Sequence, residues 1–319
     1  MKKEKDQVNS FKPFISKFMS WVEYGLKHDF YKVNISSLNL LFNIMDLIIT
    51  SSSSSEYKKI AEQMVEMMIP KFKSNDIDQE LKQTIVITMG NLLKDMGHVI
   101  SSNNLSTIFS IFLEKTANEN LRTLIFNWLT KAICQNPELK VEAYLSKFMT
   151  SLLENINKNN VILQRQTLDF LTAISQNQPN ALNGFDEQIA KSLNSLLNET
   201  NLPLFNVIYD LLSQLTNSGF AYSKNKNLLT QSVEATLKSF ELDNNESNFA
   251  GALRFLENSI NLNCVDSNKL GEFVTQILKF NHFNLTKARV VAILSKKIGN
   301  AASLVTELEK KVALFINIF

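Results

Sequence analysis

The chain has 319 residues, and its 45% apolar content is enough to build a sizeable core. Only eight Gly and five Pro occur, well below average usage of about 7% and 5%, so turn-rich β-sandwiches, barrels and glycine-rich phosphate loops are disfavoured. The 33 basic and 31 acidic residues give a net charge of +2, too balanced for a protein that binds nucleic acid mainly by neutralising phosphates.

The N-terminal sequence favours neither secretion nor membrane insertion. Lys12 and Lys17 interrupt the apolar stretch after the charged start, so no signal-peptide core of adequate length forms. The longest apolar run, residues 38–49, is far short of the roughly 20 residues that a membrane span needs. Cys134 and Cys264 show no pairing pattern, as expected for a reduced intracellular protein, and we expect the chain in the cytoplasm, the nucleus or both.

The hydrophobic pattern predicts an all-α protein. Amphipathic segments of about 15–20 residues, apolar at i, i+3, i+4 and i+7, are separated by short clusters of Asn, Ser, Asp and Pro. The helices are expected in pairs, seven and a half in all. The predicted ranges are 11–27 and 31–49, 56–73 and 78–97, 101–116 and 119–135, 138–157 and 160–177, 184–198 and 202–217, 224–241 and 246–262, 266–281 and 284–299, and a last helix from about 302.

The second helix of each pair opens near a recurring Asp or Asn, a good helix N-cap. These positions are Asp76/Asp78, Asn118/Asn120, Asn160, Asn201, Asn245 and Asn284. Their average spacing of about 42 residues matches the HEAT and armadillo range and excludes the shorter ankyrin and tetratricopeptide (TPR) periods. Such a pair cannot bury its apolar stripe alone, so neighbours must stack. We therefore predict a HEAT-repeat, ARM-like α-solenoid of about seven helix pairs, with residues 1–319 forming a single curved superhelix that lacks further C-terminal repeats.

Two segments depart from the repeat pattern. The serine run at 51–55 is predicted to be a flexible loop. Residues 314–319 continue an apolar stripe that no following helix can cover, so a hydrophobic edge is expected there. That edge predicts either a companion chain supplying the remaining repeats or self-association.

No catalytic constellation is found in the sequence. His28, His98 and His282 lie far apart and lack a second ligand at metal-site spacing. Glycine-rich phosphate loops and nucleophile elbows are absent. Cys134, beside Ile133, is predicted to be a buried structural thiol. The sequence therefore predicts a protein that is not an enzyme and that has no cofactor and no metal site.

Aromatic and basic residues could instead serve recognition. Most Phe residues fall at core spacing, as do Phe109, Phe112, Phe126 and Phe170, and a core position is also expected for Trp21 and Trp128. Basic residues recur on the second helices, but acids offset them, so an RNA groove is weakly supported. Some of these basic residues are expected to donate hydrogen bonds between repeats. The full set on the second helices is Lys82, Lys94, Arg122, Lys131, Arg165, Arg254, Lys287, Arg289, Lys296 and Lys297.

Two blocks resemble a particular HEAT family. The first is residues 76–82 followed by Met89-Gly90, and the second is residues 111–115 followed by Asn118-Glu119 and Arg122. In this order and spacing they resemble the central region of the cullin-associated, neddylation-dissociated (CAND or TIP) proteins. Weaker similarity continues to about residue 180.

The resemblance implies a scaffold that wraps an unneddylated cullin with its RING subunit and promotes receptor exchange on cullin–RING, SCF-type ubiquitin ligases. The ridge of second helices is then predicted to face the protein partner, and neither nucleic acid nor a membrane is expected. A transport adaptor of the karyopherin or coat type and a regulatory subunit of an enzyme such as a phosphatase remain alternatives. The predicted partner-facing residues are Glu80, Lys82, Arg122, Arg165 and Arg289.

Overall fold

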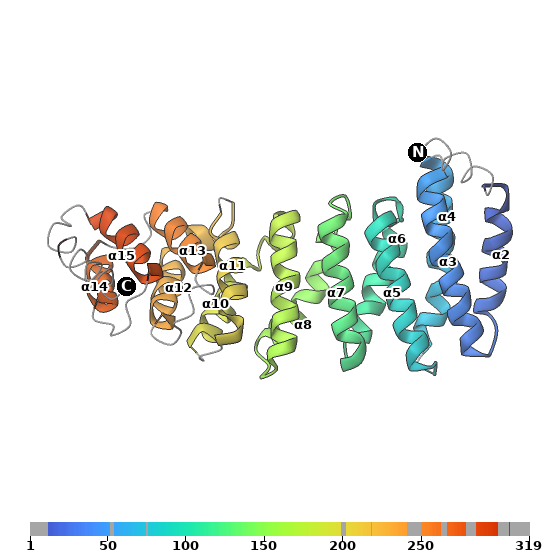
Figure 1. Cartoon of the computed structure of the whole chain (residues 1–319), viewed down its shortest axis with the longest axis horizontal. Helices are drawn as coiled ribbons and strands as arrows, with labels where there is room; N and C mark the ends of the chain where they lie inside the picture. Colours follow the sequence, from blue (N-terminus) through green and yellow to red (C-terminus); the bar gives the residue numbers. More distant parts are fainter. Residues whose placement is uncertain are drawn as a thin grey trace, which may run out of the picture. The chain divides into compact units, whose positions relative to one another are not determined.

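The computed structural model confirms the predicted all-α fold of stacked HEAT-type helix pairs (Figure 1). Within the residues that it describes, all regular secondary structure is helical. The described residues are 12–51, 54–74, 76–198, 202–217, 219–240, 250–262, 267–278, 285–298 and 306.

The observed helices agree closely with the predicted ranges, and α7 has the predicted bounds. In the first five pairs the helices are α2 (Ile15–Leu26), α3 (Tyr31–Ser51), α4 (Ser54–Lys73), α5 (Gln79–Met96), α6 (Ser102–Lys115), α7 (Glu119–Gln135), α8 (Glu142–Ile156), α9 (Val161–Asn177), α10 (Asp186–Asn198) and α11 (Phe205–Leu215). They are followed by α12 (Lys226–Ser239), α13 (Ala250–Asn261), α14 (Ser267–Leu278) and α15 (Leu285–Ile298). The last predicted helix, from about 302, lies almost wholly outside the described residues.

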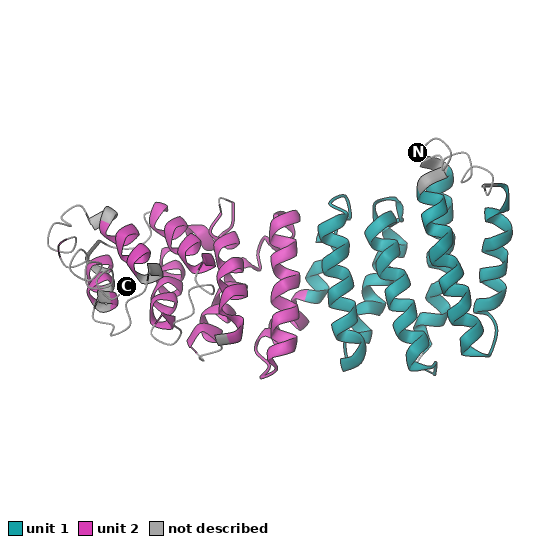
Figure 2. Cartoon of the chain, in the orientation of Figure 1, with its two compact units in different colours: residues 1–148 teal, residues 149–319 magenta. Residues whose placement is uncertain are grey.

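The chain forms two compact units, residues 1–148 and 149–319 (Figure 2). In the first unit, the second helices α3, α5 and α7 pack in succession, and the first helices α2, α4 and α6 form a second row. In the second unit, α9, α11, α13 and α15 pack in succession, and α10 packs on α12. Each unit is therefore a double row of helices. The prediction of one continuous curved superhelix stays a prediction.

The repeat period follows from where the second helices begin. The starts of α5, α7, α9, α11 and α13 lie 40 to 45 residues apart, within the HEAT range. Asp78, Asn118 and Asn160 cap α5, α7 and α9 as predicted, because each side chain accepts a hydrogen bond from a backbone N–H of the first turn. Helix α11 has no side-chain cap and follows a short 3₁₀ turn, Leu202–Leu204. The predicted caps Asn201, Asn245 and Asn284 lie outside the described residues.

Polar side chains join neighbouring repeats in the first unit. Asn136 Nδ2 donates to the Leu93 carbonyl at 3.0 Å in a buried contact between α7 and α5. Tyr144 donates its hydroxyl to the Ser102 carbonyl at 3.0 Å, linking α8 to α6. The two bonds span 43 and 42 residues, which is one repeat period. The partners of both bonds are thus separated by one repeat.

The bond from Asn136 gives a direct test of this fastening. We expect Asn136→Ala to lower the free energy of unfolding by about 0.5–1.5 kcal/mol, the net value of one hydrogen bond, because the Leu93 carbonyl keeps its second bond from the Gly97 N–H. Urea denaturation would measure it. Asn127→Ala on the exposed side of α7 is the control and should change stability by less than about 0.5 kcal/mol. Equal effects from the two variants would show that Asn136 makes no net contribution.

The core positions predicted for four Phe residues are confirmed. The Phe side chains at 109, 112, 126 and 170 are all buried. Phe112 meets Phe72 edge to face, with ring centroids 5.7 Å apart, and so joins α6 to α4. This pair of rings therefore fills space between neighbouring repeats in the row of first helices.

Two sequence predictions are wrong in part. Ser51 ends α3, and Ser54 and Ser55 begin α4, so helix extends into the serine run that was expected to be a loop; 52 and 53 lie outside the described residues. Cys134 is exposed rather than buried. It lies nine positions after buried Ile125, and at about 100° per residue this places it on the opposite side of α7. Partial burial still raises the pKa of its thiol, so the thiolate is not favoured.

Helix α3 (Tyr31–Ser51) is longer than the apolar run at residues 38–49 from which no membrane span was predicted. Among the described helices it alone is long and apolar enough to cross a membrane, over Tyr31–Ile49. In the structure it packs against α2 and α5, and Leu38, Leu41 and Ile48 are fully buried. Of the apolar stretch Tyr31–Ile49, 39% is buried inside the structure.

Candidate protein-binding surfaces

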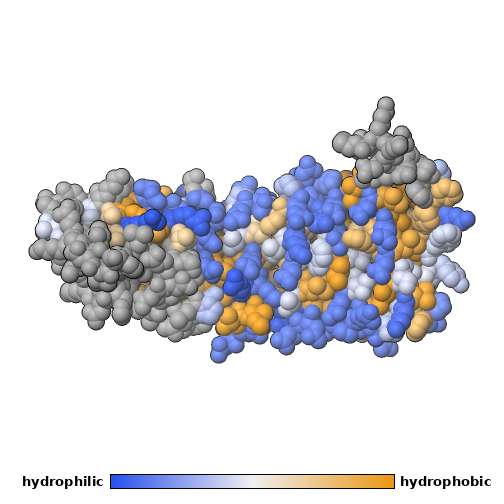
Figure 3. All heavy atoms as spheres, viewed as in Figure 1, coloured by the Kyte–Doolittle hydropathy of each residue, from blue (hydrophilic) through white to orange (hydrophobic). Residues whose placement is uncertain are grey.

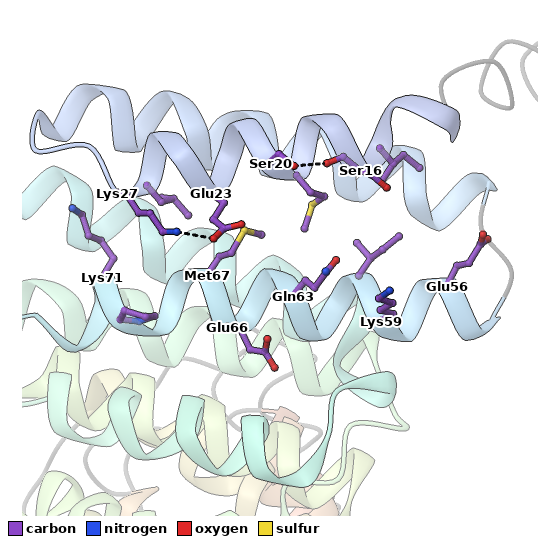
Figure 4. A pocket seen from close by; sticks show the side chains of 15 residues that line it. Ser16, Ser20, Glu23, Lys27, Glu56, Lys59, Gln63, Glu66, Met67 and Lys71 are labelled. Atoms are coloured by element: carbon purple, nitrogen blue, oxygen red, sulfur yellow. Dashed lines mark hydrogen bonds and ion pairs between the residues drawn. The ribbon is translucent and has the colours of Figure 1, made fainter.

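A groove of about 880 Å³ runs between α2 and α4 in the first unit (Figure 4). One wall presents Ile15, Met19 and Leu26 from α2, and the other presents Ile60 and Met67 from α4. Their spacings of 4 and 7 residues place each set on one side of its helix. The α2 side chains are already buried, at 5–7% exposure, and form the floor of the groove, while Ile60 and Met67 of α4 are half buried.

Charged residues border this groove on both helices. Glu23 and Lys27 on α2 form an ion pair at 2.7 Å, and Lys71 on α4 donates to the His28 carbonyl at 3.4 Å. Figure 4 shows Lys27 and Lys71 at the same end. The remaining charged lining residues are Glu56, Lys59 and Glu66.

Exposed aromatic residues lie on the other side of α2. Trp21 is 52% exposed and Tyr24 77% exposed, and Phe14, just before the helix, is half exposed. Lys17 stands over the Trp21 ring at 5.4 Å from its centroid, and Phe18 meets the same ring edge to face. Exposed Trp and Tyr rings are typical of protein interfaces.

The core position expected for Trp21 is therefore wrong, and Trp128 is half buried. A signal for the exposed rings was present in the sequence. Phe14, just before α2, and Phe18 and Trp21 within it recur at helical spacing. Each lies one position, or about 100°, from a residue of the buried stripe formed by residues 15, 19, 22 and 26. A helix with two apolar stripes buries one and offers the second. Figure 3 shows hydrophobic residues gathered over the end of the unit that α2 and α3 form.

The structure gives the predicted partner-facing residues of the first unit different roles. Glu80 is exposed on the first turn of α5, and Lys82 is half buried. Arg122 Nε donates to the Thr116 carbonyl at 2.6 Å, and its Nη2 donates to the Ala117 carbonyl at 3.4 Å. Arg122 therefore fastens the turn between α6 and α7, and less of its guanidinium is left for a partner.

In the second unit, Arg165 on α9 and Arg289 on α15 are both exposed. Partial burial raises the pKa of Asp169, one turn after Arg165, and the Arg165 charge opposes this rise. Arg254 supplies the predicted inter-repeat contact, since its Nη2 lies 2.7 Å from Asp210 Oδ1 on the preceding second helix. Both ends of this pair are exposed, so it contributes little stability.

Within the described part of the chain, no group of three His, Cys, Asp or Glu residues could hold a metal ion. His98 lies beside the Tyr57 ring, and His28 Nδ1 accepts a hydrogen bond from the Phe30 N–H at 2.9 Å. Both histidines are thus placed by local contacts. Cys264 and His282 lie outside the described residues.

Comparison with known proteins identifies the kind of repeat. Residues 3–89 match a family model described as "CAND1-like, TPR repeats". This stretch is similar to a CAND-family repeat region. The match includes the first resembling block, at 76–82, and extends to the first helix pair, while the second block, at 111–115, lies beyond it. Although the description names TPR repeats, the second helices from α5 to α13, most of which lie beyond the match, recur with a period in the HEAT range.

Two curated relatives share this similarity. The chain is 23% identical over 211 residues to Cullin-associated NEDD8-dissociated protein 1 of Dictyostelium discoideum, covering 66% of this chain and 17% of the relative. It is 24% identical over 169 residues to the Drosophila melanogaster protein of the same name, covering 51% of this chain and 14% of that one. The chain thus matches only a small part of the length of these CAND relatives.

A solved structure of an engineered protein is also similar. It shares 13% sequence identity and a TM-score of 0.33, covering 87% of this chain and 98% of that one.

Proposed function

We propose that the chain is a protein-binding scaffold that binds an unneddylated cullin with its RING subunit and so regulates the assembly of cullin–RING, SCF-type ubiquitin ligases. The observation that carries this proposal is the similarity to two proteins named as cullin-associated and NEDD8-dissociated. Stacked helix pairs suit the role because they present extended surfaces rather than a catalytic pocket. The chain acts by binding, without catalysis or a cofactor, in the cytoplasm, the nucleus or both.

A binding measurement with purified components tests the proposal. Biolayer interferometry would compare an unmodified cullin with its RING subunit and the same complex carrying NEDD8. We expect saturable binding of the unmodified complex and clearly weaker binding of the modified one. Equal binding of both forms, or binding of neither, would contradict the proposed function. Recovery of a Ran-type GTPase or a phosphatase catalytic subunit in affinity purification, without a cullin, would support the alternative scaffolds.

The second-helix ridge is proposed as the cullin-facing surface, and charge reversal tests it. The variant Lys82→Glu, Arg165→Glu, Arg289→Glu should weaken cullin binding about tenfold or more, since each rim charge contributes a modest amount and reversal adds repulsion. Arg122 is left intact because its loss would release the turn that it holds.

The control reverses charges on the first helices instead. Lys58 on α4 and Lys191 on α10 are both exposed, so Lys58→Glu, Lys191→Glu should leave cullin affinity within about twofold. Circular dichroism would confirm that both variants remain helical. If the control weakened binding as much as the ridge variant, the ridge would be the wrong surface.

A further inference from the structure

We propose that the groove between α2 and α4 is a docking site for one amphipathic helix of a protein partner, with acidic residues of that helix lying toward Lys27 and Lys71. This site is additional to the cullin-facing ridge and does not depend on a cullin being the partner. It rests on the shape of the groove, its lining and the charge at one of its ends.

The shape of the groove fits a helix. Both walls are helices, and the half-buried Ile60 and Met67 of α4, 7 residues apart, form one ridge against which a third helix can pack, above a floor of buried α2 side chains. The α2 wall runs from Ile15 to Lys27, about 18 Å at 1.5 Å per residue, so a partner helix of about three turns would cover it.

The lining favours a helix over a small molecule. Small-molecule sites are mostly apolar with a few placed polar groups, whereas six charged side chains border this groove on its two walls. An amphipathic helix would contact both the apolar and the charged lining of the groove. Its apolar stripe would cover the apolar side chains, and its polar flanks would reach the charged side chains at the border. Met19 and Met67, one from each wall, are flexible side chains of the kind that adapt to an inserted apolar ridge.

The charges orient the partner. Lys27 and Lys71 come from different helices and lie at the same end of the groove in Figure 4, where Lys71 also contacts the His28 carbonyl. Glu23 balances only one of these two lysines, through its ion pair with Lys27. Acidic side chains, or the negative C-terminal end of a helix, are therefore favoured at this end.

Three synthetic peptides provide the probes. Each has 16 residues with the same stripe of Leu at i, i+4, i+7 and i+11 and a helical background of Ala and Gln. They differ only in the exposed residues of the last turn, which are Glu, Gln or Lys. Fluorescence anisotropy with the full chain should show saturable binding, tightest for the Glu peptide, with about a two- to fivefold change for each lysine contact.

Variants of the chain locate the binding. Met67→Asp, at a half-buried position, should lower the affinity for the Glu peptide at least tenfold. Lys27→Glu, Lys71→Glu changes only the rim and should reverse the order of the three peptides. Lys58→Glu, on α4 but outside the groove lining, is the matched control and should change nothing. Hydrogen exchange should show protection by the Glu peptide in α2 and α4.

Several results would overturn the proposal. They are an absence of saturable binding by all three peptides, binding that Met67→Asp leaves unchanged, or a peptide order that the double lysine variant does not alter. Binding that appears only after removal of residues 1–11 would assign the groove to the chain's own N-terminal segment instead. Because no cullin is present in these measurements, their failure is separate from a failure of the proposed function.

Discussion

Phe112→Ala is expected to lower the free energy of unfolding of the first unit by about 3–5 kcal/mol. Phe112 is fully buried in α6 and meets Phe72 of α4 edge to face, so truncation removes apolar contact and leaves a cavity between two repeats. Urea denaturation followed by circular dichroism would measure the loss. Hydrogen exchange should show that the amides of α4 and α6 lose the most protection, because each repeat depends mainly on its neighbours.

Phe42→Ala is the control for this truncation. Phe42 lies on α3 in the same unit and is 39% exposed, so the same loss of atoms creates less of a cavity. We expect its effect to stay below about 1.5 kcal/mol. Two equal losses would mean that α4 and α6 can close around the missing ring, contrary to the packing described.

Gly90→Ala is expected to destabilise the first unit by about 1–3 kcal/mol, even though Ala favours a helix over Gly by about 1 kcal/mol. Gly90 lies in α5 against α7, and a Cβ there would come within 2.6 Å of Cβ and Cγ of Trp128. The obstacle is the base of a bulky side chain, so relief requires the two helices to move apart. Thermal or urea denaturation would give the sign of the change.

Gly271→Ala is the matched control, because Gly271 lies in α14 and a Cβ there would meet nothing within 4 Å. It should be stabilising by about 0.5–1 kcal/mol. The double variant Gly90→Ala, Trp128→Ala should lose less stability than the two single changes combined, since removing the indole opens space for the new methyl group. If Gly90→Ala stabilised the chain as Gly271→Ala does, the close approach of α5 and α7 would be disproved.

Much of the fold could be predicted because HEAT-type helices are specified locally. Leu121, Ile125 and Leu129 recur at the helical spacing on which the predicted pattern rests and are buried in α7, and Asn118 predicted where this helix begins. The close contact at Gly90 also gives a physical reason for the Met89-Gly90 pair in the resembling block. Helix α11 was less well predicted, since it starts after a 3₁₀ turn containing Pro203 rather than at an Asn cap.

The candidate site could not be predicted to the same extent, because it depends on how helices far apart in the chain approach one another. The α2–α4 groove exists only through the separation of two helices, and no local pattern specifies that distance. Arg122 was expected to face a partner, yet its guanidinium reaches back to the Thr116 carbonyl, a choice that only the folded turn offers. Trp21 could have been recognised as exposed, had the second apolar stripe of α2 been weighed against the first.

The hydrogen bonds between repeats have a consequence for the synthesis of the chain. The bonds from Asn136 and Tyr144 reach back 43 and 42 residues, and the pair between Arg254 and Asp210 reaches back 44. When such a residue leaves the ribosome, the group that it binds has therefore already emerged. Contacts of this short range carry a small loop-closure cost, so each helix pair can dock on the preceding pair while the rest of the chain is still being translated. Duplication or loss of one whole period would leave the remaining pairs with suitable neighbours.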